Sequence, residues 1–77
     1  MLSFITYKDA IEQVEIVADA KGIDQLIDYL KFVKESQDHM HLNIDAEIEP
    51  YPIPPERSDK TIYAKHVRIE FEKQTDF

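Results

Sequence analysis

Residues 39–49 read HMHLNIDAEIE, and apolar and polar side chains alternate along this stretch at every second position. The apolar positions are Met40, Leu42, Ile44, Ala46 and Ile48. Successive side chains of a β-strand point to opposite faces of the sheet, so the alternation predicts a strand with one buried and one solvated face. That arrangement is typical of an antiparallel sheet.

Three further stretches are predicted to be strands. Residues 2–7 (LSFITY) are rich in β-branched and aromatic residues, and residues 61–72 (TIYAKHVRIEFE) repeat the alternation. Residues 10–20 fit a helical stripe as well as a strand. Because Ile16 falls outside that stripe and the run is β-branched, we predict a strand over 11–19.

One helix is predicted between the second and third strands. It follows Gly22 and ends around residues 36–38, and its apolar stripe consists of Ile23, Leu26, Ile27, Leu30 and Val33. So short a helix is not stable alone, and we expect the stripe to pack on the buried face of the sheet. The order β-β-α-β-β then predicts an α+β fold in a single domain, residues 1–77. The fold would be a two-layer sandwich of a four-stranded antiparallel sheet with one helix on one face.

A proline-rich loop, residues 49–60, joins the last two predicted strands and contains all four prolines. Proline lacks a backbone donor and fixes φ, so the loop cannot be a central strand. A preordered loop with Tyr51 and Ile53 at its tip would lose little entropy on docking against a partner. The alternative is a rigid connector that folds back over the core.

The composition restricts the classes of function. The chain has no cysteine and no Ser-His-Asp, HExxH or glycine-rich phosphate pattern, so we expect neither an enzyme nor a bound cofactor. It has no secretory signal and no apolar run near the roughly 20 residues that span a bilayer, which predicts a cytoplasmic protein. A formal net charge of −7 disfavours nucleic acid and anionic membranes and favours a basic protein partner.

The three histidines are a candidate metal site. His39 and His41 project from one face of their strand, and pairing of the last two strands with residue numbers summing to 107 or 109 places His66 opposite His41 or Asn43. Three imidazoles could then gather as in zinc sites. The alternative is that His39, His41 and His66 are solvated or paired across the strands.

An aromatic residue lies off the apolar stripe of the predicted helix. At about 100° per residue, Phe32 lies roughly opposite the stripe, close to Asp28 and Glu35, while Tyr29 lies at its border. An exposed aromatic side chain among acids is typical of a binding hot spot. The alternative is that the first strand, the proline loop or Phe77 covers Phe32. The predicted partner-binding residues are Asp28, Tyr29, Phe32, Tyr51, Ile53 and Glu56.

The segment 14–42, VEIVADAKGIDQLIDYLKFVKESQDHMHL, resembles the immunity protein 32 family of bacterial polymorphic toxin systems. The resemblance is carried by the spacing Gly22-x-x-x-Leu26-x-x-x-Leu30 and by His39-x-His41-Leu42. It implies a small, acidic, non-catalytic protein that binds and blocks a toxin domain made by the same cell, with no catalytic residues.

The leading hypothesis is therefore an immunity-type inhibitor that masks a toxin, such as a basic nuclease. The alternatives are a histidine-based metal-binding domain and a domain that forms a homodimer through an edge strand.

Overall fold

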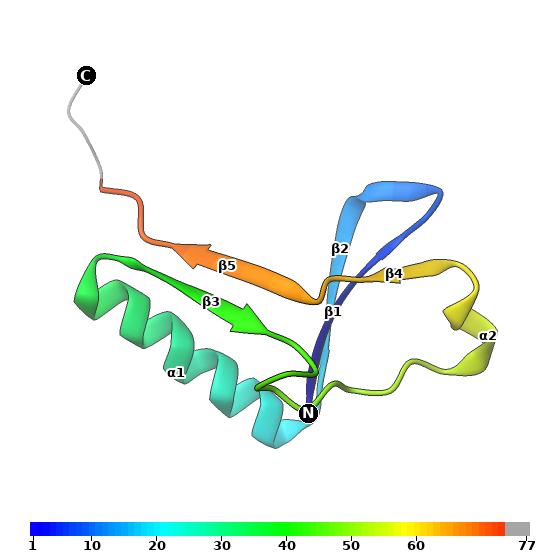
Figure 1. Ribbon diagram of the computed structural model, residues 1–77, viewed down its shortest axis with the longest axis horizontal. Coiled ribbons are helices and arrows are strands. Elements are labelled where there is room, and N and C mark those ends of the chain that lie inside the picture. Colours follow the sequence, from blue (N-terminus) through cyan, green and yellow to red (C-terminus); the bar gives the residue numbers. More distant parts are fainter. Residues whose placement is uncertain (74–77) are drawn as a thin grey trace.

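The computed structural model describes residues 1–73 (Figure 1). The elements in chain order are β1 (Leu2–Tyr7), β2 (Ala10–Ala18), α1 (Ala20–Ser36), β3 (His39–Asn43), α2 (Pro55–Ser58), β4 (Thr61–Tyr63) and β5 (His66–Glu70). The fold is α+β, with antiparallel strands and one main helix, as the sequence predicts. Residues 10–18 form a strand, which confirms the choice of strand over helix there.

The strands form two sheets in place of the predicted single four-stranded sheet. One sheet has the order β2-β1-β4, and the other pairs β3 with β5. The predicted strand over 61–72 is split because its halves pair with different partners: the N–H of Ala64 donates to Phe4 O (2.9 Å), whereas Lys65 O accepts from the N–H of Ile44 (2.9 Å). Neighbouring residues of this bend thus hydrogen-bond to different sheets.

The third strand is shorter than predicted. It ends at Asn43, and Asp45 takes a left-handed conformation with φ of 76° that turns the chain. The turn closes when the N–H of Asp45 donates to Ile48 O (2.8 Å). Ile44 and Ile48 are both buried, as predicted, but Ala46 lies at the exposed turn and its predicted burial is wrong.

Helix α1 begins two residues before Gly22, not after it. The Asp19 side chain caps the helix by accepting from the N–H of Gly22 (2.8 Å). The N-terminal ammonium of Met1 donates to the same carboxylate oxygen (2.8 Å). Gly22 is buried beneath the first strand, where an added Cβ would lie 1.9 Å from Met1 O. Only a residue without a side chain permits this approach.

The close approach at Gly22 also fixes how the helix is rotated about its axis. The side facing the sheets carries Gly22, Leu26, Tyr29 and Val33. Relative to the predicted stripe this is a rotation of roughly 60–70°, taking about 100° per residue. The predicted burial of Ile23, Ile27 and Leu30 is therefore wrong, because all three are exposed.

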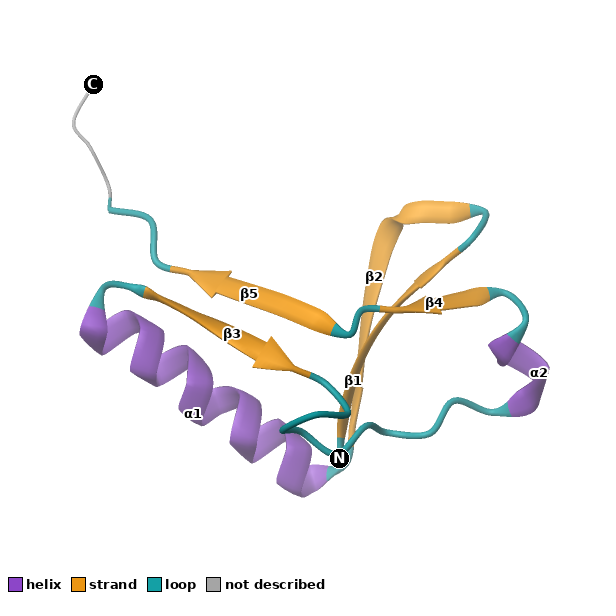
Figure 2. Cartoon of the chain, viewed as in Figure 1, coloured by secondary structure: helices purple, strands orange, loops and turns teal. Residues whose placement is uncertain are grey.

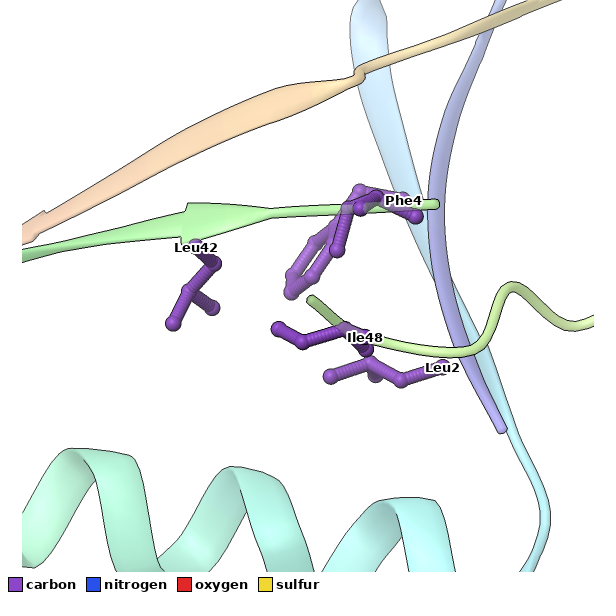
Figure 3. Close-up of a cluster of buried hydrophobic side chains, with 5 residues drawn as sticks. Leu2, Phe4, Leu42 and Ile48 are labelled. Carbon is purple, nitrogen blue, oxygen red and sulfur yellow. The ribbon is translucent and has the colours of Figure 1, made fainter. Parts of the chain in front are cut away.

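The core lies where the two sheets and the helix meet. Its buried members come from β1, β3 and the turn after β3, and they converge above α1 (Figure 3): Leu2, Phe4, Leu42, Ile44 and Ile48. Ser3 and Ile5 are fully buried on the opposite face of β1, and the proline loop contacts this face through hydrogen bonds between Tyr51 and Ser3. Figure 2 shows this loop running without regular structure from the core to the short helix α2.

Candidate functional site

Large apolar side chains are exposed in unusual number. Within residues 1–73, seven hydrophobic residues are buried and nine large ones stay exposed. Exposed apolar patches mark surfaces that bind other proteins. The nine are Ile11, Val14, Ile16, Ile23, Ile27, Leu30, Phe32, Ile62 and Tyr63.

Three of them share the face of the three-stranded sheet that carries Phe4. The register pairs Thr6 with both Val14 and Ile62, and pairs Phe4 with Ile16. The core covers the Phe4 end of this face, but Val14, Ile16 and Ile62 remain 62%, 52% and 48% exposed. We call these three side chains the open face. The sequence analysis did not identify it. The available signal was that one helix is too small to cover the whole of a four-stranded sheet.

The predicted contact residues of the helix lie on two sides of it. Asp28 is exposed and Phe32 is 55% exposed. Phe32 is therefore not covered by the first strand or the proline loop, and Phe77 lies outside the described residues. Tyr29 is half-buried against the core, and its hydroxyl accepts a hydrogen bond from Gln25 Nε2 (2.6 Å). Part of the Tyr29 side chain thus packs in the core.

The predicted contact residues of the loop are held against the sheet. Ser3 Oγ donates to Tyr51 O (2.9 Å) and accepts from the N–H of Tyr51 (2.8 Å). The N–H of Ile53 donates to the hydroxyl of Tyr63 (3.1 Å). Tyr51 and Ile53 are half-buried, and Glu56 is exposed. The loop folds back over β1, as in the connector alternative.

The helix and loop residues do not form one surface. Figure 1 shows α1 and α2 at opposite sides of the structure. A partner that contacts Phe32 near the end of α1 would have to extend across the molecule to reach Glu56 in α2. The structure therefore separates the six predicted residues into two groups.

The three histidines do gather on the solvated face of β3 and β5. Residue numbers of paired positions sum to 109, one of the two predicted registers, and His66 lies opposite Asn43. The ring centroids of His39 and His41 are 5.1 Å apart, and those of His41 and His66 are 4.8 Å apart. A hydrogen bond joins His41 Nδ1 and His66 Nε2 (2.7 Å). Among residues 1–73, no group of three or more His, Cys, Asp or Glu is arranged to hold a metal ion.

The surroundings of His41 disfavour protonation of its ring. Loss of solvent around the ring, followed by the charges of His66, His39 and Arg68, lowers the pKa of His41. At one side of the cluster, a hydrogen bond joins His39 Nδ1 to Asp38 Oδ1 (2.9 Å). The His39 main chain and then its ring lower the pKa of the Asp38 carboxyl by hydrogen bonding.

Two hollows lie near the predicted residues. The first, of about 290 Å³, is mostly apolar and is lined by Ile44, Asp45, Pro50, Pro52, Tyr63, Ala64 and Lys65. The second, of about 460 Å³, lies beside the start of the helix and is lined by Met1, Lys21, Asp24, Gln25, Asp28 and Glu49. Three carboxylates line this second hollow, which we call the acidic hollow. Lys21 and the Met1 ammonium also line it, and the ammonium is already paired with Asp19. The carboxylates still outnumber the cations, which would favour a Lys or Arg side chain.

No family model, no curated protein and no solved structure matches this chain. Neither helix within residues 1–73 has the length and apolar character needed to cross a membrane.

Proposed function

We propose that this chain is a non-catalytic protein-binding domain, and more specifically an immunity-type inhibitor that masks a basic toxin domain. The observation that carries the proposal is the exposure of nine large apolar side chains on a chain of net charge −7. Apolar anchors give affinity when a partner buries them, and the surrounding charge steers a basic partner toward them.

The proposed contact surface is the side of α1 that carries Asp28 and Phe32. These residues are four apart and so project from the same side of a helix. Asp28 also lines the acidic hollow. In the proposed complex, Phe32 packs against an apolar surface of the toxin while a basic side chain enters the hollow. The loop residues Tyr51, Ile53 and Glu56 form a second, separate contact.

Masking alone would block such a toxin. A nuclease must attract phosphate through a positively charged groove, and an acidic protein seated on that groove excludes the substrate. This requires no chemical step from the inhibitor and is compatible with the resemblance of residues 14–42 to immunity proteins. The same charge complementarity predicts fast association that slows as salt is added.

The proposal is tested by expressing the toxin-like genes that neighbour this gene, with and without the chain, and measuring growth. Rescue of growth followed by direct binding of the two purified proteins is the expected result. Phe32→Ala should weaken binding about 30-fold, a typical hot-spot loss, whereas Ile62→Ala, at a comparably exposed residue of the open face, should not. Asp28→Asn should slow association, whereas Asp9→Asn in the turn between β1 and β2 should leave it unchanged. Absence of any toxic neighbour, or growth arrest that the chain does not relieve, would refute the proposal.

A further inference from the structure

Strand β2 has a free edge in the described structure, because it is the outermost strand of its sheet. Its pairing with β1 is regular from Val14 to Ala18 and shifts between Thr6 and Tyr7. A free edge carries unpaired N–H and C=O groups and is a template for another strand. On this strand the free edge borders the open face, so an added strand would also bring its own side chains beside Val14 and Ile16.

The direction of the unpaired groups follows from the hydrogen bonding at the end of the strand. The N–H of Asp19 donates to Met1 O (3.3 Å), which continues the pairing of Leu2 with Ala18. Main-chain groups alternate in direction along a strand. The odd-numbered residues of β2 therefore face β1, and Val14, Ile16 and Ala18 face the free edge with their main chains. The same three residues carry their side chains on the face of Phe4.

We propose that this edge pairs with β2 of a second copy of the chain, antiparallel about a two-fold axis at Ile16. In this register Ile16 lies opposite Ile16 of the other copy, and Val14 lies opposite Ala18 of the other copy. The main-chain groups that meet are the unpaired ones, and the side chains that meet on this face, from Val14, Ile16 and Ala18, are all apolar. The result is a continuous six-stranded sheet in the order β4-β1-β2-β2-β1-β4.

Repulsion between carboxylates disfavours the two neighbouring registers, with the axis at residue 15 or 17. Moving the axis to residue 15 would place two copies of Glu15 directly opposite each other, and moving it to residue 17 would place Glu15 opposite Asp19. Like charges directly opposite destabilise a strand pair. With the axis at Ile16, Glu15 lies opposite Val17 of the other copy, and no carboxylate faces another.

The second copy also accounts for the exposed start of the helix. Only Asp19 separates β2 from α1, so the pairing brings the first turn of each helix beside the other copy's Val14. In the proposed dimer, the exposed Ile23 of that first turn lies near β2 of the other copy.

The dimer is tested by light scattering after size exclusion and by cysteine cross-linking, since the chain has no cysteine of its own. The parent should have twice the mass of 9.1 kDa. Ile16→Glu should raise the dimer dissociation constant at least about 30-fold. Ile62→Glu is the matched control on β4, because its exposure is nearly the same, and it should stay dimeric. A parent that remains monomeric at millimolar concentration would overturn the proposal.

Cross-linking tests the register. Paired residues across the axis have Cα atoms about 5.5 Å apart, within the range that a disulfide bridges. Mild oxidation should therefore link Ile16→Cys chains rapidly. Val14→Cys chains should not link, because their positions are four residues apart along the strands. A link through Val14→Cys without one through Ile16→Cys would refute this interface. Neither outcome depends on the toxin, so the dimer and the proposed function can fail separately.

Discussion

Replacing Gly22 with alanine should destabilise this protein, although the same change stabilises an ordinary helix. In an exposed helix interior, alanine is favoured over glycine by about 0.5–1 kcal/mol. Here the new Cβ would lie 1.9 Å from Met1 O and 2.8 Å from Met1 C, where ordinary contacts begin at 3.4 Å. The backbone of the first strand must therefore move away by about 1.5 Å, the difference between contact and clash.

The cost can be estimated from what that movement disturbs. Overpacking of a tightly packed site costs typically about 1–3 kcal/mol. The displacement also loosens the hydrogen bond from the N–H of Asp19 to Met1 O (3.3 Å), which contributes about 1 kcal/mol. Subtracting the gain in helix propensity leaves a net loss of about 1–3 kcal/mol. For a domain of this size, each kcal/mol lowers the melting temperature by about 4–8 °C.

Urea denaturation followed by far-UV circular dichroism measures this loss as a lower transition midpoint. Lys21→Ala is the control, because Lys21 is the exposed helix residue directly before Gly22. This substitution should change the free energy of unfolding by less than about 0.5 kcal/mol. A Gly22→Ala protein as stable as the parent, or more stable, would refute the clash and the helix rotation inferred from it.

Three further outcomes are expected. Ser3→Ala removes both hydrogen bonds to Tyr51 and should lower the free energy of unfolding, measured by urea denaturation, by about 1–3 kcal/mol, because it leaves main-chain groups unpaired. Ser58→Ala, at an exposed residue, should lower it less. Equal losses would contradict the anchoring role of Ser3. Because the pKa of His41 is lowered from 6.5, the unfolded chain binds this proton more tightly, and stability should fall as the pH decreases from 7.5 to 5. His41→Gln should reduce that fall and Lys34→Gln should not; an unchanged slope in His41→Gln would show that His41 is not the cause. Equimolar zinc should leave the ring NMR signals of His39, His41 and His66 in place, because no three ligand groups within residues 1–73 are arranged to hold a metal ion. Saturable micromolar shifts would contradict this.

Local patterns predicted the strands and their faces well. The alternation around Met40 and Leu42 requires that paired residue numbers in the last two predicted strands sum to an odd value, which keeps the apolar side chains on one face. One of the two registers that the sequence analysis allowed, with a sum of 109, is the one observed. Ile44 and Ile48 are buried as predicted even though the strand ends before them. Side chains in a strand alternate between the two faces with a period of two residues, and this period is visible in the sequence itself.

The rotation of the helix could not be predicted in the same way. Apolar spacing places Ile23, Ile27 and Leu30 on the buried stripe, but a backbone approach at Gly22 decides the orientation. Such an approach joins residues about 20 apart in the chain and leaves no periodic signal. The open face was missed for the same reason, because its exposure depends on how much of the sheet one helix covers.

The Asp19 cap was also missed, although its signal was present. An aspartate directly before a helical segment is a common N-cap, but Asp19 was assigned to the end of the preceding strand. The predicted helix start at residues 22–23 was consequently late. The candidate histidine cluster, in contrast, was predicted from the side-chain alternation alone. Residues 39, 41 and 66 share one face of the sheet in either allowed register.

The bend at Ala64 and Lys65 has a consequence for the biosynthesis of this protein. The ribosome makes β1, β2, α1 and β3 first. At that point β4 has not yet been made to pair with β1, and β5 has not yet been made to pair with β3. At about 5–20 residues per second, the 27 residues from Asn43 to Glu70 take about 1–5 s to synthesise. During that interval the nascent chain presents two unsatisfied strand edges. A chaperone that shields extended segments would protect it from aggregation until β4 joins the first sheet and β5 joins the second.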